Sequence, residues 1–257
     1  MADGLTSPPE PNRLLALHPF TQVGIAAVLA VAGGLFSWPI GLAVAAACFA
    51  LAATAGKLGP FFKIWWKTIL ILSGIILLLQ TFFIGGETPL VEWWIFTGTE
   101  EGFQRGLSFA GRVIGVGSAV LLLVTLLDIN RLVLALEQRG VNPRVTYIIM
   151  ATANIIPEMG KQMNVIMDAQ RARGIETDAN MWVRAQAFVP TIGPLLLSSI
   201  VGVEEKALTL ESRGFSIKGK RTSLHDLDDP AWERKLRLVL ILAIVALFIG
   251  GILLWVL

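Results

Sequence analysis

The sequence predicts an all-α, multi-pass helical membrane protein that also carries a helical module on the cytoplasmic side. First, 54% of its 257 residues are hydrophobic and 16% are charged, whereas about one quarter of an average soluble domain is charged. Second, the apolar residues form unbroken runs of the length that crosses a bilayer as a helix. Third, a more polar block, residues 128–235, separates the last apolar run from the earlier ones.

The first apolar run covers residues 21–55. As a single helix it would be roughly 50 Å long, well beyond the hydrocarbon core of roughly 30 Å. The sequence Ser37-Trp38-Pro39 interrupts the run, so two shorter helices at 21–36 and 40–55 fit better. Three further runs, at residues 65–84, 107–127 and 236–257, bring the predicted number of membrane spans to five.

These runs divide the chain into four predicted parts. Residues 1–20, which begin polar and rich in proline, are expected to form an N-terminal tail. Residues 21–127 form a membrane domain of four spans, and residues 236–257 form the last span. Residues 128–235 between them are expected to be a cytoplasmic or interfacial module with two long helices.

The charges in the loops predict the orientation. Lys57, Lys63 and Lys67 crowd the segment between the second and third spans, whereas the next loop, residues 85–106, is acidic. Because lysine and arginine concentrate in cytoplasmic loops, the lysine segment is placed inside. The N-terminus and residues 128–235 then lie in the cytoplasm, and the C-terminus lies outside.

Small residues recur at every fourth position of the fourth span, at Gly111, Gly115 and Ala119. Such residues allow two helix backbones to approach closely within a bilayer, so they predict a helix-packing face. The facing helix belongs either to this chain, which is the simpler interpretation, or to another membrane protein.

The polar block begins with a predicted short amphipathic helix, residues 129–139, which Gly140 closes. Pro143 suits the first turn of a long helix that reaches Arg173, and Pro157 is expected to kink it. An apolar stripe on this helix either packs within the module or offers a pliable surface to a partner. The stripe consists of Met159, Met163, Ile166 and Met167.

A second long helix is predicted from near Pro194 to Arg213, with apolar residues at helical spacing along one side. Segments 147–156 and 185–200 of the block are apolar enough either to lie at the membrane surface or to cross it, and both interpretations remain open. The apolar stripe of the second helix consists of Leu196, Ile200, Val203, Ala207 and Leu210.

Both long helices end in a small residue, an arginine and a glycine. Glycine adopts the left-handed conformation and ends a helix abruptly. An arginine in the last turn is favoured by the helix dipole, and its planar group can bind a carboxylate of a facing protein through two hydrogen bonds. Arg-Gly is a common helix ending that also occurs at Arg139-Gly140, so it is not specific alone. The two triplets are Ala172-Arg173-Gly174 and Ser212-Arg213-Gly214.

The combination of motifs within residues 168–222 resembles the T component of energy-coupling factor (ECF) transporters. Members of that family carry two Ala-Arg-Gly triplets at the ends of cytoplasmic coupling helices. Ser212 replaces the alanine of the second triplet, whereas both arginines are present. The segments that carry the resemblance are Gln170-Arg171-Ala172-Arg173-Gly174, Pro194-Leu195-Leu196-Leu197 and Leu210-Glu211-Ser212-Arg213-Gly214-Phe215.

The resemblance implies a non-catalytic membrane subunit of an ECF-type ABC transporter complex in a prokaryotic plasma membrane. Such a subunit couples a homo- or heterodimer of ABC-type ATPases to a small membrane protein that captures a vitamin or metal ion. No catalytic residue, cofactor, metal site or nucleic-acid partner is expected, and the sequence does not identify the transported substrate. The residues implied to contact the ATPases are Ala172, Arg173, Gly174, Ser212, Arg213 and Gly214.

A self-sufficient secondary membrane carrier is the main alternative. Such carriers usually place ionisable groups at mid-membrane and contain repeated halves, and the sequence displays neither. A phosphate-binding loop near residue 220 is excluded because Arg221 occupies the position that requires Ser or Thr. His225, Asp226, Asp228 and Asp229 match no familiar metal site and are expected to form a solvated turn.

Overall fold

The protein forms two compact units in this computed structural model, which describes residues 13–84, 89–93, 96–174, 181–217 and 227–256. The first unit, here named the membrane unit, contains residues 1–135 and 227–257. The second, named the α8–α9 unit, contains residues 136–226. The chain therefore passes from one unit to the other within α7 (Ile129–Gln138) and returns shortly before α10 (Ala231–Val256).

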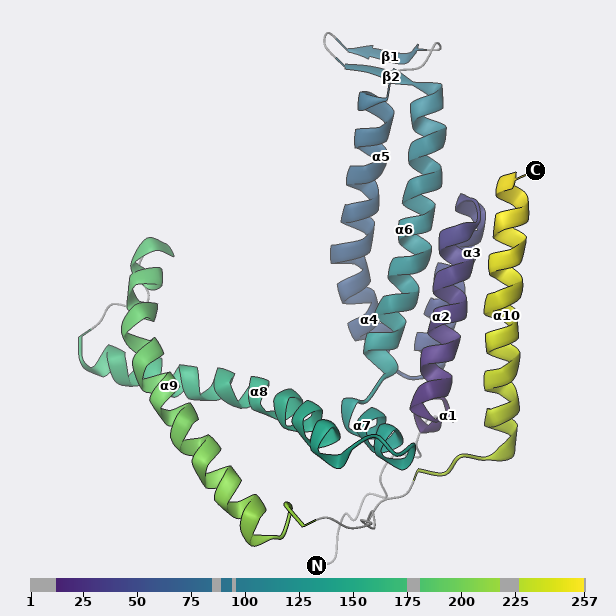
Figure 1. Ribbon diagram of the computed structural model, residues 1–257. Coiled ribbons are helices and arrows are strands. Elements are labelled where there is room, and N and C mark those ends of the chain that lie inside the picture. The colour runs from purple at the N-terminus through teal and green to yellow at the C-terminus, as the bar shows by residue number, and fades with distance from the viewer. Residues whose placement is uncertain (1–12, 85–88, 94–95, 175–180, 218–226, 257) are drawn as a thin grey trace, which may run out of the picture. The chain divides into compact units, whose positions relative to one another are not determined.

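The membrane unit is built from apolar helices that lie side by side (Figure 1). A π-helical turn, Trp66–Leu70, continues α4 into α5, and two short antiparallel strands lie between α5 and α6. Apart from this strand pair the described chain is helical, which confirms the predicted fold class. Besides α7 and α10, the elements are α1 (Arg13–Ala16), α2 (Pro19–Leu35), α3 (Trp38–Thr54), α4 (Leu58–Trp65), α5 (Ile71–Phe83), β1 (Pro89–Trp93), β2 (Phe96–Thr99) and α6 (Glu100–Leu126).

Three of the described helices are long and apolar enough to cross a membrane: Leu58–Phe83, Glu100–Leu126 and Ala231–Leu253. Helices α2 and α3 are also apolar but have only 17 residues each. Each of these two is about 25 Å long at 1.5 Å per residue, slightly less than the hydrocarbon core. Local thinning of the bilayer accommodates such a difference at modest cost.

Helix α6 is the centre of the membrane unit, because α2, α3 and α5 all pack against it. A Cβ atom added to Gly41 on α3 would lie 2.0 Å from the carbonyl oxygen of Gly111. One added to Gly33 on α2 would lie 2.9 Å from the Cα atom of Gly115. Ala119 is fully buried in the hydrophobic core. The small residues of α6 therefore pack against helices of the same chain.

Several helices begin earlier than the apolar runs indicated. Helix α10 begins at Ala231 rather than at position 236, and α4 begins at Leu58 rather than at position 65. Helix α6 begins at Glu100, where the hydroxyl of Thr99 accepts a hydrogen bond from the Gly102 N–H at 3.2 Å. Hydropathy marks the apolar middle of a membrane helix, whereas caps and long polar side chains extend its ends.

The structure describes only the last part of the expected N-terminal tail, residues 13–20. Residues 1–12 lie outside the described part of the chain, but residues 13–20 form α1 and the start of α2. Leu17 and His18 in this segment are buried. Local composition did not reveal this burial because it depends on residues far along the chain.

The α8–α9 unit consists mainly of two long helices that contact each other, α8 (Pro143–Ala172) and α9 (Met181–Ser212) (Figure 1). Pro157 lies inside α8, which continues through it. The prediction that the second helix begins near Pro194 is wrong, because α9 begins 13 positions earlier and includes Pro190 and Pro194. An internal proline costs roughly 3 kcal/mol, and the long helical stretches on both sides outweigh that cost.

The two stripes of this unit differ in burial. The apolar stripe of α8 is half-buried, but the stripe on α9 is not, since Leu196, Ile200 and Val203 are 55%, 57% and 60% exposed. Neither α8 nor α9, to which the ambiguous segments 147–156 and 185–200 belong, is among the helices long and apolar enough to cross a membrane. Helix α9 thus keeps an apolar face that no other described part of the chain covers.

Candidate functional site

The first predicted site lies at the C-terminal end of α8. Gly174 has a φ of +86°, a left-handed conformation that glycine adopts without steric cost. Its N–H donates to the carbonyl oxygen of Arg171 at 2.9 Å, and the Arg173 N–H donates to that of Gln170 at 3.0 Å. These short turns satisfy carbonyl groups that the end of a helix would leave free. Ala172, Arg173 and Gly174 are exposed.

The second predicted site lies at the C-terminal end of α9 and has a similar backbone. Gly214 has a φ of +73°, and its N–H donates to the carbonyl oxygen of Glu211 at 2.9 Å. The Phe215 N–H reaches back to the carbonyl oxygen of Leu210, also at 2.9 Å, which completes a Schellman cap. Ser212 and Arg213 are exposed at this end, and Gly214 is half-buried.

Within the described part of the chain, the arginine side chains that directly precede the two glycines have no partner. Among the described residues, neither the guanidinium group of Arg173 nor that of Arg213 forms a hydrogen bond or ion pair. Arg171, one turn before the end of α8, differs because its Nη1 lies 3.3 Å from Oδ1 of Asp168. Two cationic groups are therefore available to acceptors outside the described chain. Carboxylates are their preferred acceptors.

The two arginine ends lie toward opposite ends of α8. The ring of Phe215, just beyond α9, packs against the ring of Tyr147 in the first turns of α8, with centroids 5.1 Å apart. Arg173 immediately follows the other end of this 30-residue helix, which corresponds to a length of about 45 Å. The unit therefore presents two separate contact points rather than one composite site.

The glycine cap itself does not distinguish these two ends. Gly140, at the end of α7, has a φ of +87° and closes its helix with the same type of hydrogen bond, from its N–H to the carbonyl oxygen of Glu137 at 2.9 Å. The cap geometry is thus shared by all three Arg-Gly sequences of the described module. The helix-packing residues Gly111, Gly115 and Ala119 form a separate set in the membrane unit.

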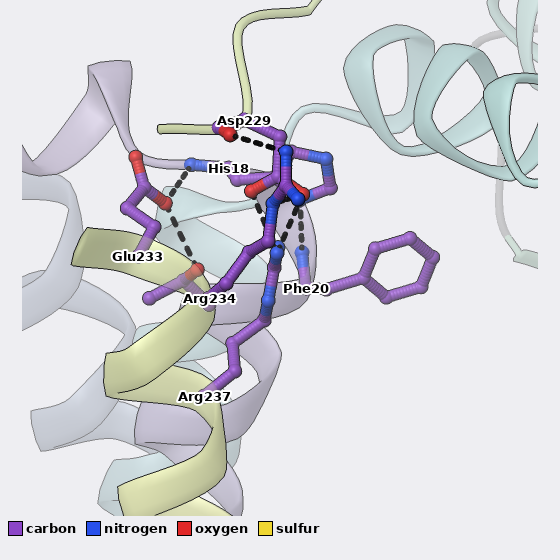
Figure 2. A network of polar contacts seen from close by, with 7 residues as sticks. His18, Phe20, Asp229, Glu233, Arg234 and Arg237 are labelled. Atoms are coloured by element: carbon purple, nitrogen blue, oxygen red, sulfur yellow. Dashed lines mark hydrogen bonds and ion pairs between the residues drawn. The ribbon is translucent and has the colours of Figure 1, made fainter. Parts of the chain in front are cut away.

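Sequence reasoning missed a cluster of polar residues in the membrane unit, drawn in Figure 2. Asp229 was expected in a solvated turn, but its carboxylate accepts two hydrogen bonds from Nη2 of Arg237, at 2.6 and 2.7 Å. Glu233 is also buried in this cluster and receives hydrogen bonds from the start of α2. His225 and Asp226 lie outside the described residues. The only sequence signal was the presence of charged residues in the first turns of the last apolar helix.

The environment of Asp229 lowers the pKa of its carboxyl group below the ordinary value of 3.8. Partial burial acts in the opposite direction and raises the pKa, because it disfavours the charged form. The hydrogen bonds and positive charge of Arg237 outweigh that effect, and His18 and Arg234 add to the lowering. Asp229 is therefore a carboxylate at neutral pH.

The apolar helices of the membrane unit and the helix pair α8–α9 define a helical membrane protein, and comparison with known proteins specifies its family. A family model described as cobalt transport protein (CbiQ) matches residues 14–224, which include both arginine ends. The chain therefore belongs to the CbiQ cobalt transport protein family.

The curated relatives that the chain matches are transmembrane proteins of energy-coupling factor transporters. The chain is 30% identical over 160 residues to the energy-coupling factor transporter transmembrane protein EcfT of Staphylococcus aureus, a match that covers 59% of this chain and 60% of that protein. It is 26% identical over 219 residues to the EcfT protein of Lactobacillus helveticus, with 76% of each chain covered. A third match, to EcfT of Limosilactobacillus fermentum, is 26% identical over 184 residues and covers 67% of this chain and 68% of that protein. The matches support the predicted T component of ECF transporters.

Proposed function

We propose that this chain is the coupling subunit of an ECF-type ABC importer. In this role it transmits ATP-driven motion of nucleotide-binding subunits to a membrane subunit that captures a vitamin or a metal ion. The chain itself is non-catalytic, and a homo- or heterodimer of partner ATPases hydrolyses the ATP. The observation that carries the proposal is the pair of exposed arginines, Arg173 and Arg213, which have no partner among the described residues.

The spacing of the two arginines fits a dimeric partner. Because the ends lie toward opposite ends of a helix about 45 Å long, each can bind a different ATPase subunit. A planar guanidinium group forms two parallel hydrogen bonds with a carboxylate, and such charge-assisted bonds are about twice as strong as neutral ones. Movement of the two ATPase subunits relative to each other would then move the two helices.

The apolar face of α9 provides a second type of contact. Leu196, Ile200 and Val203 are more than half exposed, and exposed apolar surface is stabilised by contact with another apolar surface. A substrate-capture subunit embedded in the membrane is expected to present such a surface. A single helix would thereby contact an ATPase at its polar end and the membrane partner along its side.

The orientation proposed from the loop charges agrees with this role. ATP is available in the cytoplasm, so the α8–α9 unit belongs on that side of a prokaryotic plasma membrane, as does the N-terminus. The segment that contains Lys57, Lys63 and Lys67 lies on the same side by the positive-inside rule. The C-terminus, one membrane span further on, then lies outside.

Copurification tests the proposal. The chain, expressed with its neighbouring subunits and extracted in mild detergent, is expected to retain nucleotide-binding subunits. The double variant Arg173→Glu/Arg213→Glu is expected to lose them, because two attractive contacts become repulsive. Arg139→Glu is the matched control, since Arg139 also precedes a capping glycine but directly follows α7 rather than α8 or α9.

Two results would contradict the proposal. Normal assembly of the doubly substituted chain with ATPase subunits would show that Arg173 and Arg213 are not needed to bind those subunits. Substrate transport by the purified chain alone, in vesicles without ATP, would instead support the secondary carrier.

A further inference from the structure

The chain connects the two units twice, once on leaving the membrane unit and once on returning to it. Both of these passages are attached to the same short segment of the membrane unit. This segment, named here the N-terminal elbow, consists of residues 14–22 and contains most of α1, the link after it and the start of α2. One passage runs through α7 and the other ends at the start of α10. The contacts that attach them are made by Arg131 of α7 and Glu233 of α10.

Arg131 binds the first half of the elbow. Its Nη1 donates to the carbonyl oxygen of Leu15, and its Nη2 donates to that of Ala16 at 2.9 Å. These two carbonyl groups belong to the last residues of α1, where a helix has no intrahelical donors left to satisfy them. The rigid fork of one guanidinium group supplies both donors. The start of α7 is thereby fixed to the elbow through two bonds from one side chain.

Glu233 binds the second half of the elbow (Figure 2). Its Oε2 accepts hydrogen bonds from the backbone N–H of His18 and from the hydroxyl of Thr21, both at 2.9 Å. Glu233 and His18 are 4% exposed and Thr21 is fully buried. Loss of one partner of a buried carboxylate leaves polar groups unsatisfied at a substantial cost. The contact therefore resists separation of α2 and α10.

The position of Glu233 explains why a buried carboxylate is stable there. It lies in the first turn of α10, and it accepts a bond from His18, the N-cap residue of α2. The N-terminal end of a helix carries partial positive charge, which stabilises a carboxylate nearby. One carboxylate is thus shared by the first turns of two helices. Asp229, two positions before α10, is held in the same region by Arg237.

We infer that the N-terminal elbow transmits movement of the α8–α9 unit to the membrane helices, with Arg131 and Glu233 as its positioning residues. This inference rests on the proposed coupling function. Because both passages of the chain are fixed to one segment, displacement of either passage reaches α2 and α10 together. Without these contacts, displacement of α7 or of the start of α10 is not passed on to the elbow.

The test uses the complete transporter complex in lipid nanodiscs and compares two states, without nucleotide and trapped with Mg-ATP and orthovanadate. Amide hydrogen exchange is followed at the helix ends, residues 170–174 and 210–215, and at the elbow and the start of α10. In the unmodified chain, the trapped state is expected to change exchange in both regions. In the double variant Arg131→Ala/Glu233→Ala, the nucleotide-dependent change in exchange is expected to remain at the helix ends. The corresponding change at the elbow and at the start of α10 is expected to be lost.

Two further variants separate transmission from stability. Glu233→Gln keeps an oxygen that accepts both hydrogen bonds. With Arg131 intact, this single variant is therefore expected to keep the nucleotide-dependent change in exchange at the elbow and at α10. Arg112→Ala removes another arginine–carbonyl contact of the membrane unit, from Arg112 Nε to the Phe36 oxygen at 3.4 Å, and is expected to retain the change. Arg112 lies in α6, outside both passages between the units.

The outcomes distinguish the inference from the proposed function. If ATPase subunits copurify but the Arg131→Ala/Glu233→Ala variant responds to nucleotide at the elbow as the unmodified chain does, the inference is overturned alone. The same conclusion follows if Glu233→Gln loses the response while the complex stays assembled and Arg112→Ala retains it. If no ATPase subunit copurifies with the unmodified chain, the proposed function fails and the inference fails with it.

Discussion

The ring of Phe215, just beyond the end of α9, packs against the ring of Tyr147 in the first turns of α8, with their centroids 5.1 Å apart. This contact fixes the arginine end of α9 against the start of α8. Phe215 also donates its N–H to the Leu210 carbonyl oxygen at 2.9 Å, so the cap and the ring contact act on the same residue. The position of Arg213 therefore depends on the contact between Tyr147 and Phe215, which lies two positions after Arg213.

Substitution of Phe215 by alanine is expected to weaken binding at the Arg213 end. Aromatic pairs contribute about 1 kcal/mol beyond their buried area, which corresponds to about a fivefold loss of affinity for an ATPase subunit. The measurement is a titration of immobilised chain with purified ATPase subunits. Tyr147→Phe, which keeps both rings, is the control and should bind normally. Unchanged affinity of Phe215→Ala would show that the ring pair does not position Arg213.

Substitution of Gly174 by alanine is expected to deform the other arginine end. Its φ of +86° costs an L-residue roughly 1–2 kcal/mol, and no atom lies within 4 Å of an added Cβ, so the effect is conformational. Retention of ATPase subunits on copurification should fall. Gly160→Ala is the matched control, because Gly160 also has open space around it but lies inside α8 with ordinary helical angles. Equal behaviour of the two variants would contradict the prediction.

Substitution of Gly41 by alanine is expected to destabilise the membrane unit. The new Cβ atom would lie 2.0 Å from the carbonyl oxygen of Gly111, and backbone atoms cannot move aside without separating α3 from α6. Overpacking of this kind costs roughly 1–3 kcal/mol. Thermal unfolding in detergent should therefore shift to lower temperature. Gly74→Ala on α5 has nothing within 4 Å of the added atom, and a similar shift in that control would exclude the packing explanation.

The sequence predicted the features that depend on local composition. Long apolar runs indicated the membrane helices, and glycine after arginine indicated where α8 and α9 end. Both signals act over a few neighbouring residues, through burial of apolar surface and through the left-handed angle at Gly174 or Gly214. These elements were therefore visible without any knowledge of the fold.

The start of α9 and the burial of Glu233 could not be predicted in this way. Pro190 and Pro194 favour a helix break locally, but the helical residues on both sides carry α9 through them. Glu233 looks like one of several charges flanking the last apolar helix, and its burial depends on His18 and Thr21, more than 200 positions earlier. Contacts between segments that are distant in the sequence cannot be read from the pattern of neighbouring residues.

Stability of the membrane unit is expected to depend on pH through Asp229. Its pKa in the folded chain lies below 3.8, the ordinary value expected for the unfolded chain. The ionised carboxylate therefore contributes stability that is fully present above 3.8 and is lost as the pH falls through the folded-state value. Asp229→Asn should lower the unfolding temperature at neutral pH, and the difference from the unmodified chain should shrink on acidification. Thermal unfolding measured from neutral pH into this acidic range provides the comparison.

The control for this effect is Asp168, which pairs with Arg171 at 3.3 Å on the exposed surface of α8. Solvent-exposed ion pairs contribute roughly 0–1 kcal/mol, so Asp168→Asn should leave the unfolding temperature nearly unchanged at every pH. Arg237 binds Asp229 through both carboxylate oxygens and is only 13% exposed, so screening by solvent is weaker there. A difference between Asp229→Asn and the unmodified chain that stays constant down to the lowest pH would show that the Asp229 carboxylate is not the titrating group. Its contribution would then come from contacts that do not depend on its charge and that the Asn side chain does not reproduce, such as the second of the two hydrogen bonds from Arg237.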